Sequence, residues 1–245
     1  MSFLRVTGIL CGGCLLLYGT STAALYWTMR QPLDRFGAIM RYVPNVAMAI
    51  LPFEPMWMSA RAGSLRPGDT TPDFDLPAVD HTRRVRMSEE CRSKPVVLIF
   101  GSYTRPPFRR EVPELNSLYD NYKDRASFYI VYIKEAHPVD LWQMPSNERD
   151  HVLLYSPRTD ADRFENAGQC VRKLGIRIPV LIDGVDDRTE LGYTGWPERL
   201  YVIAPGGRIV YKSAPGPFGF KPKTMETYLS KVWGEAPRSG LSAAR

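Results

Sequence analysis

The stretch Pro95-Val-Val-Leu-Ile-Phe-Gly-Ser-Tyr-Thr-Arg-Pro-Pro-Phe108 decides the fold of this 245-residue chain. Its first half is a continuous apolar run, which is typical of a strand buried on both faces of a sheet. Pro106 and Pro107 suit the first turn of a helix, because the first N–H groups of a helix have no partner within it. We therefore predict a strand that runs into a tight turn, which in turn opens a helix.

The residues after this turn predict a regular succession of helices and strands. Helices are expected over residues 112–122, 159–174 and 223–233, strands over 128–133 and 178–182, and a hairpin over 200–212 around Pro205-Gly-Gly207. Parallel strands joined by helices and followed by an antiparallel pair indicate an α/β fold with a mixed central sheet flanked by helices. Thioredoxin-like folds share this order, and they place a cis-proline before the strand that faces the helix start. Pro197 stands at that position.

The N-terminal part of the chain predicts a transmembrane helix. Residues 6–29 carry no charge and are largely apolar, and twenty-four helical residues span about 36 Å. A cleaved signal peptide is the competing interpretation, since Ser21-Thr22-Ala23 has the small residues of a cleavage site, but the apolar run continues past it. We favour an uncleaved single-pass anchor. Its orientation stays open because arginines flank both ends.

Four segments are expected along the chain. They are an anchor over residues 1–30, a stalk or linker with an apolar, interfacial segment over 31–66, a thioredoxin-like domain over 67–233, and a disordered tail over 234–245.

Charge and composition exclude two classes of function. The net charge of +6 comes from 32 Lys and Arg against 26 Asp and Glu, and its densest cluster, Arg83-Arg84-Val85-Arg86, is short. A solvated loop or strand edge explains that cluster better than a nucleic-acid site does. The three histidines have no metal-ligand spacing, so neither a metal nor another cofactor is expected.

Four short motifs, in order, resemble those of the iodothyronine deiodinases and their bacterial relatives. They are Gly101-Ser-Tyr-Thr-Arg-Pro-Pro-Phe108, Ile133-Lys-Glu-Ala-His-Pro-Val-Asp-Leu-Trp142, Pro197-Glu-Arg-Leu-Tyr-Val-Ile203 and Gly216-Pro-Phe-Gly-Phe220. That family is a membrane-anchored branch of the thioredoxin and peroxiredoxin (redoxin) superfamily. The resemblance implies reductive deiodination of iodothyronines, in which a selenolate or thiolate attacks iodine and a thiol reductant regenerates the enzyme.

The resemblance also implies roles for individual residues. The nucleophile position corresponds to Arg105, and the nearby family cysteine corresponds to Tyr103. Three further catalytic positions are implied at Thr104, Glu135 and His137. Substrate-binding positions are implied at Ser102, Tyr103, Pro197 and Arg199.

With Arg105 at the nucleophile position, the chain cannot perform the first chemical step that the resemblance implies. A helix start lowers the pKa of a thiol and favours an anion, whereas guanidinium is a permanent cation and not a nucleophile. The sequence therefore predicts a pseudoenzyme that binds a small aromatic or anionic ligand. Arg105, Arg109 and Arg110 could together hold a carboxylate or phosphate, or could form a solvated basic rim.

The alternative is a thiol oxidoreductase that works through Cys170 or Cys91. A free cysteine is more often an inert core residue than a reactive one, which weighs against this alternative. Cys11 and Cys14 lie in the apolar N-terminal stretch, outside any strand-to-helix turn, and have no redox context.

Overall fold

The computed structural model describes residues 3–234, and the chain divides after Ala62 into two compact units. The predicted tail, residues 234–245, lies outside the described residues apart from Gly234.

The N-terminal unit consists of four helices. They are α1 (Phe3–Met29), α2 (Leu33–Met40), α3 (Asn45–Ile50) and α4 (Phe53–Ala60). The last three each follow a proline, which suits the entry to a helix. The C-terminal end of α1 packs against α2 and α4, with a hydrogen bond between Tyr26 and Ser59 at 3.1 Å. Among the described residues, α1 is the one helix long and apolar enough to cross a membrane, over Thr7–Met29.

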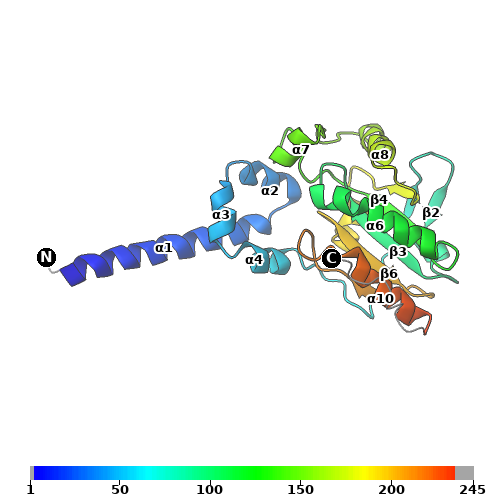
Figure 1. Ribbon diagram of the computed structural model, residues 1–245, viewed down its shortest axis with the longest axis horizontal. Coiled ribbons are helices and arrows are strands. Elements are labelled where there is room, and N and C mark those ends of the chain that lie inside the picture. The colour runs from blue at the N-terminus through cyan, green and yellow to red at the C-terminus, as the bar shows by residue number, and fades with distance from the viewer. Residues whose placement is uncertain (1–2, 235–245) are drawn as a thin grey trace, which may run out of the picture. The chain divides into compact units, whose positions relative to one another are not determined.

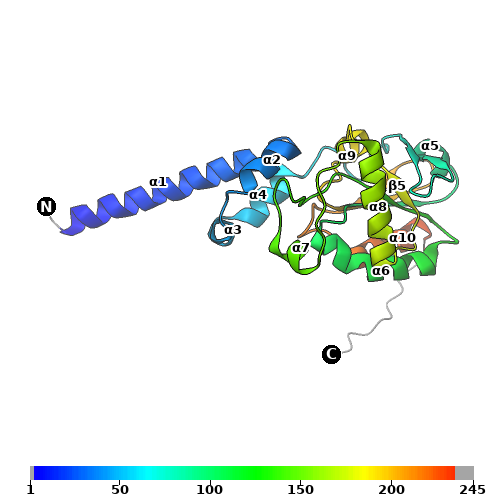
Figure 2. The same ribbon diagram turned by 90° about the horizontal axis from the view of Figure 1, so that it is seen from above.

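A five-stranded mixed sheet forms the centre of the C-terminal unit (Figures 1 and 2). Its order is β5 (Val180–Ile182), β4 (Ser127–Tyr132), β3 (Val96–Gly101), β6 (Arg199–Ile203) and β7 (Ile209–Lys212). The first three strands are parallel, and β6 and β7 are antiparallel to their neighbours. All six residues of β3 are buried, as the apolar run predicted. The thioredoxin-like fold expected from the sequence is confirmed.

Helices cover this sheet and complete its core. One hydrophobic cluster joins β3 to helices α6 (Pro106–Tyr122), α8 (Asp160–Leu174) and α10 (Pro222–Val232). Elsewhere Phe100 of β3 contacts Tyr193 of α9 (Arg188–Tyr193), with ring centroids 5.1 Å apart. Because successive residues of a strand point to opposite faces, the apolar run supplies side chains to both layers.

A two-stranded sheet and three short helices complete the C-terminal unit. Strand β1 (Asp75–Pro77) pairs with β2 (Arg84–Arg86), so the basic cluster is a strand in which Val85 is buried and both arginines contact Asp75. Helix α5 (Met87–Glu90) overlaps residues 88–94, where the sequence favours a short helical turn before β3. The short helices α7 (Pro145–Arg149) and α9 had no clear signal in the sequence.

Candidate functional site

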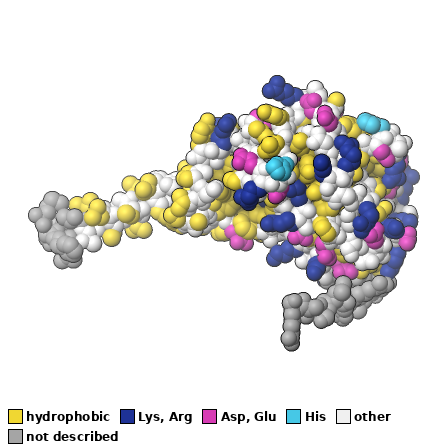
Figure 3. Space-filling view, turned by 45° about the horizontal axis from the view of Figure 1, so that its top comes forward, with side chains coloured by type: hydrophobic (Ala, Val, Ile, Leu, Met, Phe, Trp, Pro, Cys, Tyr) yellow, Lys and Arg dark blue, Asp and Glu magenta, His cyan; other side chains and the backbone are white. Residues whose placement is uncertain are grey.

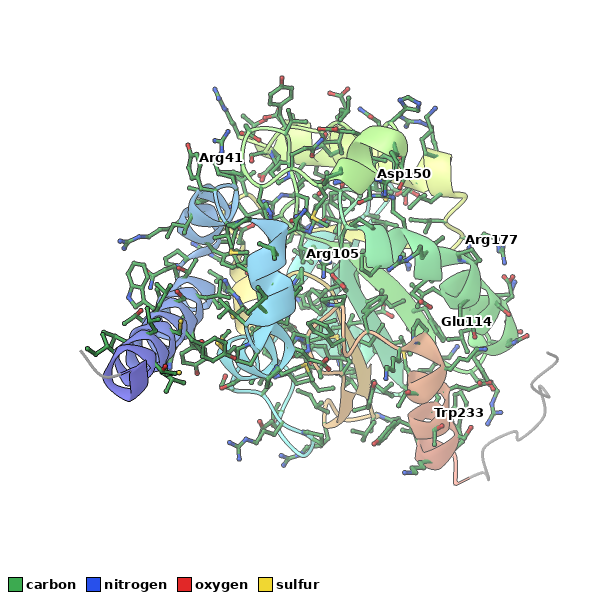
Figure 4. All side chains as sticks on the ribbon, turned by 60° about the vertical axis from the view of Figure 1, so that its left-hand side comes forward. Arg41, Arg105, Glu114, Asp150, Arg177 and Trp233 are labelled. Carbon is green, nitrogen blue, oxygen red and sulfur yellow. The ribbon has the colours of Figure 1, made fainter. Side chains whose placement is uncertain are left out.

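The turn between β3 and α6 carries the candidate site, as the opening motif predicted. Arg105 is the residue before α6, and its N–H donates to the carbonyl of Ser102 at 3.2 Å. Pro106 and Pro107 occupy the first two helical positions. Figure 4 labels Arg105 at this helix start.

The guanidinium of Arg105 is buried and held by two side chains. The residue is 7% exposed, its Nε donates to the carboxylate of Glu198, and its Nη1 lies 2.8 Å from Nε2 of His137. The other ring nitrogen of His137, Nδ1, lies 3.0 Å from the carbonyl oxygen of Trp142. A carbonyl can only accept, so we assign the proton to Nδ1, and Nε2 accepts from Arg105.

Electrostatics support this assignment for His137. Burial first, and the charge of Arg105 second, hold the pKa of His137 well below its usual value. The imidazole is therefore neutral at physiological pH and acts as an acceptor for the cation. It is not a source of protons in this arrangement.

Strand register explains how Glu198 reaches Arg105 across 93 residues of sequence. Phe100 pairs with Arg199, so residue 198 lies beside the turn that follows β3. The Trp196–Pro197 peptide bond is cis, as the thioredoxin-like order of elements predicted. Glu198 is fully buried; burial raises the pKa of its carboxyl, and the charge of Arg105 opposes that rise.

The backbone of Gly216 lies directly against the carboxyl group of Glu198. A Cβ atom on residue 216 would lie 1.9 Å from Oε1 of Glu198, a distance that no side chain tolerates. The turn motif that begins at Gly216 therefore has a local physical reason for its glycine.

A second buried network lies on the β4 side of the turn. Glu135 accepts hydrogen bonds from the N–H of Thr104 at 2.9 Å, from its hydroxyl at 2.6 Å, and from the hydroxyl of Tyr132. Burial raises the pKa of Glu135, and these three hydrogen bonds oppose the rise. The hydroxyl of Ser102 accepts from the N–H of Ala136 at 3.2 Å. The structure thus brings Ser102, Thr104, Glu135 and His137 together at this turn. The roles that the resemblance implies for them stay predictions.

Asn147 of α7 joins the two networks, and nothing in the sequence singled it out. Its amide nitrogen donates to the carbonyl of Thr104 at 2.7 Å and to the carbonyl of His137 at 3.4 Å. Its amide oxygen accepts from Nη1 of Arg109 at 2.8 Å. The second terminal nitrogen of Arg109 pairs with Asp150 at 2.5 Å. Arg105 and Arg109 thus both hold groups of the chain itself, and Arg110 is exposed. The predicted clamp of three guanidinium groups is not preformed.

Asn147→Ala is expected to lower the free energy of unfolding by about 1–3 kcal/mol, because buried partners lose their hydrogen bonds. Thermal unfolding of the full chain in detergent would measure it. Asn121→Ala, on the exposed side of α6, is the matched control and should change stability by less than about 0.5 kcal/mol. Equal effects of the two substitutions would contradict a joining role for Asn147.

The remaining implied substrate positions are also enclosed. Tyr103 is buried, and its N–H donates to the hydroxyl of Tyr132 at 3.2 Å. Arg199 is buried in β6 and donates to the carbonyl oxygen of Ser213 at 3.4 Å.

The two candidate thiols are in surroundings that suppress reactivity. Cys91 and Cys170 are both free and buried. Burial raises the pKa of Cys91 and raises that of Cys170 well above its usual value, with the nearby Glu135 adding to the second effect. Since the thiolate is the reactive form, neither position favours thiol chemistry.

We expect a thiol reagent such as Ellman's reagent to leave both thiols unmodified in the folded protein and to modify both after denaturation. The measurement uses the Cys11→Ser/Cys14→Ser background, since those two cysteines are exposed. Rapid modification of Cys91 or Cys170 in the folded chain would revive the oxidoreductase alternative.

Comparison with known proteins agrees with the motifs. The family model described as iodothyronine deiodinase matches residues 54–233. The type I iodothyronine deiodinase of Xenopus laevis is 34% identical over 139 residues, which cover 57% of this chain and 53% of the relative. The thyroxine 5-deiodinase of Gallus gallus is 32% identical over 165 residues, which cover 67% of this chain and 62% of the relative. The match therefore spans only about half to three fifths of each relative's length.

Solved structures give a consistent fold. An uncharacterized conserved protein from Geobacillus kaustophilus is 18% identical, covers 74% of this chain and 89% of its own, and has a TM-score of 0.50. That similarity concerns the fold alone. The family match covers most of the chain and includes both the turn before α6 and strand β6, and on this ground the chain belongs to the iodothyronine deiodinase family.

Proposed function

We propose that this chain is a membrane-anchored, non-catalytic member of its family, which binds a ligand and does not reduce it. One observation carries the proposal: the guanidinium of Arg105 is buried between Glu198 and His137 at the position that the family resemblance gives to the nucleophile. A cation that is already neutralised by the protein replaces the anion on which the family's chemistry depends.

The surroundings of Arg105 are suited to a cation. Glu198 is fully buried beside it, and a carboxylate in that place would raise the pKa of a thiol and so disfavour the thiolate. The neutral His137 accepts from Arg105 and offers no charge to an anionic nucleophile. The site as built therefore supports a structural ion pair in place of catalysis.

Helix α1 supports the membrane part of the proposal. Its segment Thr7–Met29 has the length and apolar character of a single membrane-spanning helix. Figure 3 shows hydrophobic side chains distributed along the described part of this helix.

The proposed ligand is a small aromatic molecule with an anionic group. The name of one relative, thyroxine 5-deiodinase, supplies the first probe, since thyroxine has both features. Thyronine, which keeps the two rings and the carboxylate but lacks the iodine atoms, is the matched probe for the contribution of iodine.

The test measures iodide release and binding separately with the full chain in detergent. We expect no iodide release from thyroxine with dithiothreitol, under conditions where the type I enzyme of Xenopus laevis is active, and saturable thyroxine binding in equilibrium dialysis. Iodide release by the wild-type chain would overturn the non-catalytic proposal. If release also disappeared in Cys170→Ser or Cys91→Ser, the thiol alternative would replace it. If thyroxine did not bind, the proposed ligand would be wrong, but the proposal that the chain is non-catalytic would stand.

A further inference from the structure

Helix α3 presents large apolar side chains that the N-terminal unit does not cover. No residue of α3 is buried, and Val46 and Ile50 are 59% and 64% exposed. Tyr42, just before this helix, is 80% exposed. Helices α2 and α4 differ, because each contributes buried residues, and their Phe36 and Trp57 rings lie 5.5 Å apart. The segment 31–66 is therefore partly a packed stalk and partly an uncovered apolar surface.

The depth of α1 in a bilayer would place this surface at the membrane boundary. Residues 7–20 of α1 are all exposed, and Leu25 is its first buried residue. The eighteen residues 7–24 span about 27 Å of helix, close to the roughly 30 Å thickness of the hydrocarbon core. The packed part of the N-terminal unit thus begins where the hydrocarbon core would end. Tyr26 and Trp27 then lie at interfacial depth, which aromatic side chains favour.

Charge around these helices complements phospholipid headgroups. Residues 30–62 contain four arginines against two acidic residues. Three of the arginines follow α1, lie in α2 or follow α2, and each stacks on an aromatic ring. They are Arg30 over Tyr26, Arg35 over Trp27 and Arg41 over Tyr42, at 4.9–5.8 Å from the ring centroids. Such pairs combine an apolar body with a cationic end, which matches the boundary between acyl chains and phosphates. Figure 4 labels Arg41 at the end of α2.

We propose that Tyr42 and α3 lie in the interfacial layer of the phospholipid bilayer that α1 crosses. The chain then contacts the membrane twice, through one helix that spans it and one short segment that lies on it. Because α3 follows α1 in the same compact unit, the bilayer is the apolar partner already next to it. This inference rests on the proposed anchor role of α1.

Site-directed spin labelling of the full chain in phosphatidylcholine vesicles tests the inference. The background carries Cys11→Ala and Cys14→Ala, while Cys91 and Cys170 stay buried. Labels are placed singly by Val46→Cys and Ile50→Cys, by retaining native Cys14 in α1, and by Leu191→Cys as an exposed leucine of the C-terminal unit. Collision with oxygen, which concentrates in lipid, is compared with collision with a water-soluble nickel chelate.

We expect the oxygen-to-nickel collision ratio at positions 46 and 50 to exceed the ratio at 191 several-fold and to lie below that at Cys14. If the ratios at positions 46 and 50 equalled the ratio at 191 while the ratio at Cys14 stayed lipid-like, the interfacial position of α3 would be wrong. The proposed membrane anchor α1 would still stand. Shielding of 46 and 50 from both reagents would overturn it in favour of a protein contact. A water-like ratio at Cys14 itself would refute the anchor and, with it, this inference.

Discussion

Glu198→Ala is expected to lower the free energy of unfolding by about 3–5 kcal/mol, because it leaves the guanidinium of Arg105 buried without its counter-ion. Guanidinium does not lose its proton at accessible pH, so the charge cannot be relieved by titration. His137 is neutral and supplies a hydrogen bond but no opposing charge. Burial keeps the pKa of Glu198 raised in the folded wild type despite the charge of Arg105, so the wild type is relatively more stable in acid and the loss should be larger at pH 5 than at pH 8.

Urea unfolding of the full chain in detergent, followed by near-ultraviolet circular dichroism, measures this loss. Glu165→Ala, on the exposed side of α8, is the matched control and should change stability by less than about 0.5 kcal/mol. The double variant Arg105→Met/Glu198→Ala removes both charges, and it should be less destabilised than the sum of the single variants. Strict additivity would argue against a direct ion pair.

Arg105→Met is expected to be destabilised relative to wild type at neutral pH and, unlike Glu198→Ala, to recover stability in acid. It leaves the carboxyl of Glu198 buried without a cation, and burial then raises its pKa with no charge to oppose the rise. A carboxyl whose pKa is higher in the folded state than in the unfolded state stabilises the fold when protonated. Its contribution is complete below the unfolded pKa of about 4.3 and is lost as pH rises through the folded pKa.

The variant should therefore lose about 3 kcal/mol relative to wild type at pH 7 and regain most of it near pH 4.5. Unfolding free energies of the wild type, Arg105→Met and Glu198→Ala over this range would show the contrast, since only Arg105→Met recovers in acid. Arg105→Lys is the control that keeps a charge, and it should show a shallower pH dependence than Arg105→Met. A constant difference between Arg105→Met and wild type across the range would contradict this account of Glu198.

Local signals in the sequence were sufficient to predict the strand and the helix on either side of the turn at Arg105. The apolar run of β3 and the two prolines that open α6 are each read from neighbouring residues, so strand, turn and helix were all predicted. Pro197 was placed correctly because the order of elements fixed its context. Helix α7 gave no such signal, since it is five residues long and contributes one buried residue, Asn147.

The partners of Arg105 could not be derived from the sequence because they depend on strand register. Glu198 was visible in a quoted motif, but its proximity to Arg105 requires the pairing of Phe100 with Arg199. The pairing of Gly101 with Tyr132 similarly brings Glu135 and His137 beside the turn. The resemblance implies that Arg105 stands at the family's nucleophile position, and the structure pairs its guanidinium with Glu198.

The buried pair also bears on how readily a nucleophile could be introduced at residue 105. A single change of Arg105 to cysteine would leave the enclosed Glu198 beside the new thiol, at a cost in stability and with a raised thiol pKa. Removing Glu198 first would leave Arg105 without its counter-ion. We expect each single change to be less stable than the present protein, so placing an anionic nucleophile at residue 105 calls for a coordinated change at residue 198, which is 93 residues away in the sequence.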